Sequence, residues 1–591
     1  MLAVARTPAG GNRFEAPIFV TETNHFRDAI HNFVSAVEQS PDAVHKIVSG
    51  MECWRDAVHK NVNGNSASPD AAHRFVKRIK LARGGAHSFV SAIGGGRDAG
   101  HKIVRRSRRT FCTAGARFIS RRCATLQAMK LPEALLQSLE GIPGYDRDAF
   151  VQVHESGTQV TSIRVNPAKP QAAGSLFQGP DGPSQLADSK SKIPWSRYGY
   201  YLAARPSFTF DPLFHSGAYY VQEASSMFVE QALAQHADLS APLRVLDLCA
   251  APGGKSTHLQ SLLAPGSLLV SNEVIKARAA ILSENLTKWG AGNSIVTSND
   301  PAHFAKLEGF FDVIVVDAPC SGSGLFRRDP DAIGEWSPAN VQLCQGRQQR
   351  ILADVWPALK EGGLLVYSTC SYSAEEDEFI LDWLSTTFQV EPLPLQCSDA
   401  GIVEVRSPQG GWGYRFYPDR VRGEGFFLAA FRKRDAAEKP RFKTKPADLL
   451  SAKETAALGE WLDTSGLRIL RHGSRVLALP EAALPDFTLL QSALYIQQAG
   501  TSVGEPIRDK LVPDHGLAMS PRVAGSVPRT ELSYGDAIRF LQRQDFMIDT
   551  QRGWQLVTFM GQPLGWINAL PNRLNNYYPR EWRIRAQGPS A

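Results

Sequence analysis

The stretch LRVLDLCAAPGGKSTHL, residues 243–259, joins a short apolar run to a glycine-rich turn and then to a helical pattern. The apolar run is typical of a strand buried in a parallel sheet. The turn at 252–254 ends the strand, and residues 255–263 are predicted to form a helix. Glycines let the backbone approach a ligand closely, and the first N–H groups of a helix are unpaired. The stretch therefore predicts a strand–turn–helix unit that can bind a ligand.

Acidic residues after the next two apolar runs favour a cofactor at this turn. The turn itself matches neither the P-loop pattern nor the full dinucleotide pattern, and alone it could be an ordinary connection. GSLLVSNE ends at Glu273, and SIVTSND ends at Asp300. An acid at the end of the second strand of a doubly wound fold binds ribose hydroxyls. Either acid alone would more often be a solvated loop residue, but the pair indicates a nucleoside-containing cofactor.

Two cysteines end further apolar runs that are predicted to be buried strands. FDVIVVDAPC ends at Cys320, and GGLLVYSTC ends at Cys370. A single cysteine at such a position is usually a small apolar filler. A cysteine in its thiolate form is also a nucleophile that can form covalent intermediates. Two thiols at strand ends near a nucleotide-type turn therefore suggest covalent chemistry beside a bound cofactor.

Together these segments resemble the motifs of a known protein family. CAAPGGKST, DAPCSGSG and YSTCSYSAEE resemble the three signature motifs of the Sun/Fmu-type RNA (cytosine-C5)-methyltransferases. VQEASSMF at 221–228 and GEGFF at 423–427 resemble the segments that flank those motifs. The resemblance covers residues 129–434. Residues 561–584 resemble the small PUA-like RNA-binding module of one bacterial subgroup, which modifies small-subunit ribosomal RNA.

The resemblance implies an α/β fold: a Rossmann-like class I methyltransferase domain, a small N-terminal α/β domain and a C-terminal PUA-like RNA-binding module. It also implies S-adenosyl-L-methionine as the cofactor. Cytosine C5 is a poor nucleophile until a thiolate adds to C6, so the enzyme needs a covalent catalyst. The family assigns attack to the T-C cysteine, here Cys370, and help with product release to the P-C cysteine, here Cys320.

The remaining site residues follow from the same resemblance. Asp317 maps to the acid that contacts the cytosine edge, and it is also a candidate cofactor contact. Lys255 is a candidate source of the positive charge that a thiolate needs. Glu273 maps to the ribose contact and Asp300 to the adenine contact. The cofactor loop comprises Cys249, Ala250, Ala251, Pro252, Gly253, Gly254 and Lys255.

Other functions fit these motifs less well. A DNA cytosine-C5 methyltransferase would use the P-C cysteine as nucleophile, and the T-C cysteine would not be expected. A non-catalytic RNA-binding or ribosome-assembly factor would be favoured by the loss of either cysteine, and both are present. Methylation of adenine N6 or of glutamine would call for an N-P-P-Y-type motif, where D-A-P-C stands. We predict 16S ribosomal RNA as the substrate, with tRNA as the alternative.

The composition fits a cytoplasmic enzyme, which we expect to be a monomer. A chain of 591 residues suggests several domains, and eight cysteines are too few and scattered for a disulfide framework. Cys249, Cys344 and Cys397 are interpreted as structural thiols. No Cys/His spacing predicts a metal site. No apolar run of about 18 residues predicts a membrane span, and no signal-peptide pattern opens the chain.

Residues 1–128 contain a repeat with a period of fourteen residues. In each unit a histidine is followed three positions later by a valine. Fourteen residues approximate four helical turns, but this period is short for a solenoid, and Gly, Ser and Asn interrupt it. The histidines in register are His31, His45, His59, His73, His87 and His101.

This repeat region carries twenty basic and nine acidic residues, so it accounts for the net charge of +7 of the whole chain. A basic arm could bind RNA phosphates, and a histidine array could bind metal. A tandem DNA repeat translated from a misassigned start is a third interpretation. It is the one we favour, because MKLPEALLQSLEGIPG from Met129 resembles a family start. We expect the region to be disordered or poorly packed.

The chain is therefore predicted to have five parts. These are a repetitive basic extension at 1–128, an N-terminal RNA-binding subdomain at 129–205, the methyltransferase domain at 206–434, a linker with a small α/β domain at 435–525, and the PUA-like module at 526–591.

Overall fold

The computed structural model describes residues 130–169, 191–397, 399, 401–437, 443–507 and 510–586, and the backbone of 178–179 and 182–183. The repeat region, and with it every prediction made for residues 1–128, lies outside the described residues.

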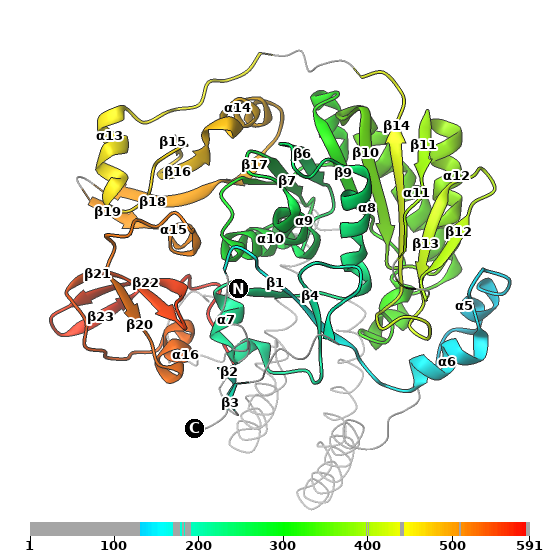
Figure 1. The fold of residues 1–591 in the computed structure, drawn as a ribbon, viewed down its shortest axis with the longest axis horizontal. Helices are drawn as coiled ribbons and strands as arrows, with labels where there is room; N and C mark the ends of the chain where they lie inside the picture. The colour runs from blue at the N-terminus through cyan, green and yellow to red at the C-terminus, as the bar shows by residue number, and fades with distance from the viewer. Residues whose placement is uncertain are drawn as a thin grey trace, which may run out of the picture. The chain divides into compact units, whose positions relative to one another are not determined.

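A ten-stranded sheet forms the centre of the described chain (Figure 1). Its strands run in the order β12-β13-β14-β10-β9-β6-β7-β8-β17, and β11 pairs with β14. The strands from β10 through β8 are parallel, whereas β14 is antiparallel to β10. The carboxyl ends of the parallel strands therefore meet at one edge. The strands are β6 (Arg244–Asp247), β7 (Leu268–Asn272), β8 (Ser294–Thr297), β9 (Phe311–Asp317), β10 (Leu359–Thr369), β11 (Val390–Leu393), β12 (Val403–Arg406), β13 (Trp412–Phe416), β14 (Phe426–Lys433) and β17 (Ile496–Ala499).

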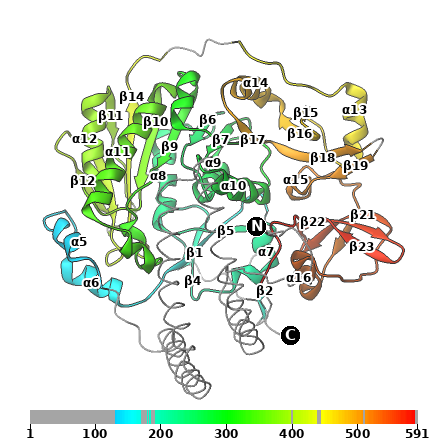
Figure 2. The same ribbon diagram turned by 180° about the vertical axis from the view of Figure 1, so that it is seen from behind.

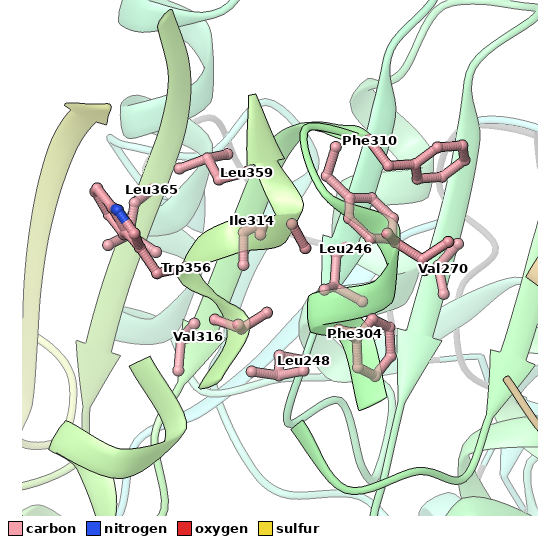
Figure 3. Close-up of a cluster of buried hydrophobic side chains, with 14 of the residues drawn as sticks. Leu246, Leu248, Val270, Phe304, Phe310, Ile314, Val316, Trp356, Leu359 and Leu365 are labelled. Carbon is pink, nitrogen blue, oxygen red and sulfur yellow. The ribbon is translucent and has the colours of Figure 1, made fainter. Parts of the chain in front are cut away.

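Alternate residues of these strands pack on opposite faces of the sheet, as the twofold period of a strand requires. Leu246 and Ile314 belong to one buried cluster, which Figure 3 shows in close-up, and Val245 and Val313 belong to another. Because both faces of the sheet are covered at its centre, central strands such as β7 and β9 are largely apolar. The helices are α8 (Val229–His236), α9 (Gly254–Leu262), α10 (Lys276–Trp289), α11 (Pro338–Val355), α12 (Glu378–Thr387) and α14 (Leu484–Ala493).

The N-terminal part of the described chain carries a small three-stranded sheet in the order β4-β1-β5. Its third strand lies beyond residue 205, the domain boundary expected from the sequence. Asp146 begins one helix by accepting a hydrogen bond from Ala149 N, which is a typical N-cap. The elements are α5 (Glu133–Ser138), α6 (Arg147–Glu155), β1 (Thr161–Val165), β2 (Gln178–Gly179), β3 (Gly182–Pro183), β4 (Gly199–Leu202), α7 (Pro212–His215) and β5 (Tyr219–Val221).

Two small sheets follow the catalytic sheet in the chain, in the orders β15-β16-β18-β19 and β20-β21-β22-β23. Strands β21 and β22 pair as a hairpin, and its turn has positive φ at Met560 and Gly561. The elements are α13 (Ala452–Ala457), β15 (Leu467–His472), β16 (Arg475–Pro480), β18 (Thr501–Ile507), β19 (Lys510–Pro513), α15 (His515–Met519), β20 (Arg529–Glu531), α16 (Tyr534–Gln542), β21 (Gly553–Phe559), β22 (Gln562–Leu570) and β23 (Arg573–Asn576).

One short strand after the catalytic domain returns to the catalytic sheet. β17 pairs antiparallel with β8, the last parallel strand, and lies beside α10 when seen from behind in Figure 2. The pairing covers an edge that would otherwise expose unpaired backbone groups. The amide of Asn299 reinforces it, because its Nδ2 donates to Tyr495 O and its Oδ1 accepts from Tyr495 N.

The C-terminal module packs against the N-terminal part through a shared apolar cluster. Phe540 and Tyr578 of the module join Leu213 and Tyr219 of the N-terminal part in this cluster. Tyr578 is fully buried, so it belongs to the core. Tyr577 is 38% exposed and is available to a ligand.

Candidate active site

The glycine-rich turn between β6 and α9 is held from behind by α10. Arg278 donates to Ala251 O at 2.9 Å, and Asn285 donates to Pro252 O at 2.8 Å. Gly253 has a φ of +115°, and a Cβ at this residue would lie 3.3 Å from the side chain of Asn285. This position favours glycine for two reasons: its backbone is left-handed, and a Cβ would crowd Asn285. The braced turn presents the N-terminus of α9 to a ligand.

Asp247, the last residue of β6, is a buried acid beside this turn. Ser256 Oγ donates to its Oδ2 at 2.7 Å, while Oδ1 has no hydrogen-bond partner among the described residues. Burial raises the pKa of Asp247 to about 7. An unpaired buried carboxylate oxygen is costly unless a ligand binds it. The sequence reasoning missed Asp247 as a site residue, although its place at the strand end before the glycine-rich turn was a usable signal.

The two acids predicted to contact the cofactor lie after neighbouring strands of the same edge. Glu273 follows β7, is 5% exposed, accepts from Ile275 N at 2.9 Å and pairs with Arg278 at 3.2 Å. Asp300 was expected to end a strand, but β8 ends at Thr297. Asp300 instead caps a short 3-10 helix at 301–307, and Asn299, between the strand and this helix, binds the backbone of Tyr495 just before β17.

The two cysteines meet at the carboxyl edge. Cys370 directly follows β10, and Cys320 lies three residues after β9. Their Sγ atoms are 3.0 Å apart. The hydrogen bond to Cys370, together with burial, raises the pKa of Cys320 well above its ordinary value. Cys320 therefore keeps its proton at neutral pH and can donate it to the sulfur of Cys370.

Lys255 and Asp317 form an ion pair at the same edge. Lys255 Nζ lies 2.8 Å from Asp317 Oδ2, and Ser368 Oγ donates to Asp317 Oδ1 at 2.8 Å. Burial alone would lower the pKa of Lys255, but the charge of Asp317 raises it above its ordinary value. Asp317 is 36% exposed at its side chain, so it stays accessible to a substrate. The four residues predicted to be catalytic are thus gathered at one edge of the sheet.

The remaining predictions concern the cofactor loop and the three cysteines interpreted as structural. Ala250 N donates to Asn272 O at 2.8 Å, which ties the cofactor loop to β7. Cys249 packs against the apolar core, and burial raises the pKa of its thiol. Cys344 is buried and Cys397 is exposed, and neither is in a disulfide. In the described part of the chain, no group of three or more His, Cys, Asp or Glu residues could hold a metal ion.

The fold and the acids fit a nucleoside cofactor. A parallel sheet bordered by antiparallel strands, a braced glycine-rich turn and acids at the ends of the first two parallel strands are typical of an S-adenosylmethionine-dependent methyltransferase, the class to which this chain belongs. The unpaired oxygen of Asp247 and the unpaired N–H groups of α9 suit a ligand that carries both a cationic and a carboxylate group.

Three family models match this chain. The model of the 16S rRNA methyltransferase RsmB/F family matches residues 234–432. The models of the N-terminal domain and the PUA domain of RsmF match residues 131–224 and 527–584. The chain belongs to this family of RNA 5-methylcytosine methyltransferases, with the N-terminal and PUA domains of RsmF.

Several known proteins are similar to this chain. The ribosomal RNA small subunit methyltransferase F of Serratia proteamaculans is 30% identical over 76% of this chain and 96% of its own length. That of Cronobacter sakazakii is 31% identical with the same coverage. A methyltransferase homologue from Pyrococcus horikoshii is a solved structure with 29% identity, a TM-score of 0.39, and coverage of 51% of this chain and 100% of that chain. In the part of the chain that the structure describes, no helix is long and apolar enough to cross a membrane.

Proposed function

We propose that the protein methylates C5 of a cytosine in 16S ribosomal RNA through a covalent bond between Cys370 Sγ and cytosine C6. The observation that carries the proposal is the pair of thiols, with Sγ atoms 3.0 Å apart, at the edge that also holds Lys255 and Asp317. The ribosomal substrate rests on the names of the relatives. A monomeric, cytoplasmic enzyme stays a prediction.

The geometry supports different roles for the two cysteines. Cys320 keeps its proton, so Cys370 is the thiol assigned to attack, and the ammonium of Lys255 lies nearby to stabilise the negative charge of an attacking sulfur. The carboxylate of Asp317 can bind the polar edge of the cytosine and make C6 more electrophilic. S-adenosylmethionine, when bound, supplies the methyl group that C5 accepts after Cys370 has added to C6.

Release of the product requires the C5 proton to leave and the Cys370–C6 bond to break. Once Cys370 Sγ is bonded to carbon, its hydrogen bond no longer holds the proton on Cys320. The main cause that raises the pKa of Cys320 is then removed. Cys320 becomes able to exchange a proton at the stage where the adduct must be resolved. In this order of steps, Cys370 acts in the attack on C6 and Cys320 acts in the release of the product.

Two cysteine variants test these roles with ribosomal RNA and a tritiated methyl donor. Cys370→Ala should abolish methylation and leave the Kd for S-adenosylmethionine within about threefold, because its sulfur acts in covalent catalysis. Cys320→Ala should accumulate a protein–RNA adduct that survives a denaturing gel. That adduct should be missing in the double variant. A trapped adduct in Cys370→Ala would reverse the roles, and normal turnover by Cys370→Ala would reject the covalent mechanism.

A further inference from the structure

The residue that follows each active-site cysteine is a serine, and both serines bind the same buried carboxylate. Ser321 Oγ and Ser371 Oγ donate to Oε2 of Glu376, the second at 2.7 Å. Ser321 N donates to Oε1 of Glu376 at 2.8 Å. Glu376 lies six residues after Cys370 and is fully buried.

A third element joins the same carboxylate. Gln348 of α11 donates from Nε2 to Glu376 Oε1 at 3.0 Å and to Pro319 O at 3.1 Å. Pro319 directly precedes Cys320. The loop that carries Cys320 is therefore tied to Glu376 on both sides of the cysteine. The loop that carries Cys370 is tied through Ser371.

An ionised carboxylate can accept from every member of this set of partners. Glu376 accepts from four donors: the N–H and O–H of Ser321, the O–H of Ser371 and the amide of Gln348. A glutamine would replace one of the two acceptor oxygens by an amide NH₂ group, so the partners on that side would have to reorient and accept instead of donate. Burial raises the pKa of Glu376, and the serine and glutamine donors oppose that rise. Hydrogen bonds to a charged acceptor are short and directional, which suits an element that fixes geometry.

We propose that Glu376 is a positioning residue that holds the two cysteine loops in register, so that both thiols reach the same cytosine. The inference rests on the proposed function, in which Cys370 attacks and Cys320 assists release. Because Glu376 is fully buried, it acts through Ser321 and Ser371. Its negative charge also adds to the causes that keep the proton on Cys320, after the hydrogen bond with Cys370 and burial.

The first test compares two buried carboxylates. Glu376→Gln should lower kcat at least about tenfold while the Kd for S-adenosylmethionine changes less than about threefold, because a small misplacement of reacting groups is costly. Glu230→Gln is the matched control. Glu230 is also buried and accepts from Ser196, Arg197 and His258, but it has no contact with the cysteine loops. Turnover of Glu376→Gln within about twofold of the wild type, or an equal loss in Glu230→Gln, would overturn the proposal.

The second test uses single hydroxyls, so it stands even if Glu376→Gln does not fold. In a Cys320→Ala background, Ser371→Ala should slow adduct formation about threefold to tenfold, because it frees the Cys370 loop. In the presence of Cys320, Ser321→Ala should instead lengthen the lifetime of the adduct. A merely structural role would slow both steps alike, and that result would reject the positioning role. Adduct formation by Cys370→Ala would contradict the proposed function itself, so the two failures are distinguishable.

Discussion

At the scale of single residues, Asp247 is the group whose environment most directly predicts a ligand. Its carboxyl is fully buried, one oxygen has a serine partner, and the other has no partner among the described residues. A cationic amino group of the cofactor would satisfy the second oxygen. Because a charge-assisted hydrogen bond contributes about 1.5–3 kcal/mol, Asp247→Asn should weaken S-adenosylmethionine binding roughly tenfold or more.

The same residue predicts how binding depends on pH. Burial raises the pKa of Asp247 to about 7 in the free protein, so the carboxyl is protonated at lower pH and cannot pair with a cation. Affinity should therefore weaken as pH falls from 8 to 6, by up to about tenfold per unit below the pKa. Calorimetry at several pH values measures this. A wild-type slope equal to that of Asp247→Asn would remove Asp247 from the cofactor site.

At the scale of elements, the loop after β9 packs closely against two other segments, the loop that carries Cys370 and the segment before β14. Gly324 N donates to Cys370 O, and Gly425 N donates to Gly324 O. A Cβ at Gly324 would lie 2.5 Å from Gly425 O and 2.8 Å from Cys370 O. Backbone atoms cannot give way as a flexible side chain can. The glycine is therefore needed to let the loop of Cys320 lie against the loop of Cys370.

Gly324→Ala should accordingly lower both stability and turnover. Overpacking of this kind costs about 1–3 kcal/mol, and the shifted loop should separate the two thiols. The thermal midpoint and the rate of methyl transfer measure the two effects. Gly334→Ala is the matched control, because its Cβ would meet nothing within 4 Å and its φ is not positive. Equal behaviour of the two variants would show that the close approach has no consequence.

The elements also show what the sequence could and could not predict. The apolar runs that end at Asp317 and Thr369 are strands, because a strand buried on both faces must be apolar along its whole length. Glu376 stood within the quoted motif YSTCSYSAEE, yet its role depends on Ser321 and Gln348, which are distant in sequence. No local pattern indicates which of several acids will face such partners.

The strand β17 escaped prediction for a related reason. IQQA is short and half polar, and its pairing with β8 is decided by the free edge of a sheet formed some two hundred residues earlier. The same pairing explains why the expected strand up to Asp300 ends at Thr297. The class of fold was thus readable from local patterns. The way in which the small C-terminal sheets extend and cover it was decided by tertiary contacts.

At the scale of the whole molecule, the junction between the N-terminal part, α10 and the C-terminal module contains a buried histidine. His515 lies against the rings of Tyr578 and Trp582, at centroid distances of 5.3 and 5.0 Å. Neither ring nitrogen has a hydrogen-bond partner among the described residues. Burial, with the charges of Lys288 and Lys169, lowers the pKa of His515 to about 3. The folded protein therefore keeps this imidazole neutral.

This depressed pKa predicts that the junction weakens in acid. An unfolded histidine has a pKa of about 6.5, so between pH 6.5 and 3 the unfolded chain binds one more proton than the folded chain does at this position. Its contribution to stability is present above pH 6.5 and is lost as pH falls, by about 1.4 kcal/mol per pH unit for one proton. His515→Phe keeps an aromatic ring and removes the titration. The drop in Tm between pH 7.5 and pH 5 should therefore be smaller in this variant than in the wild type. An identical drop would mean that His515 is not the group that makes the junction sensitive to acid.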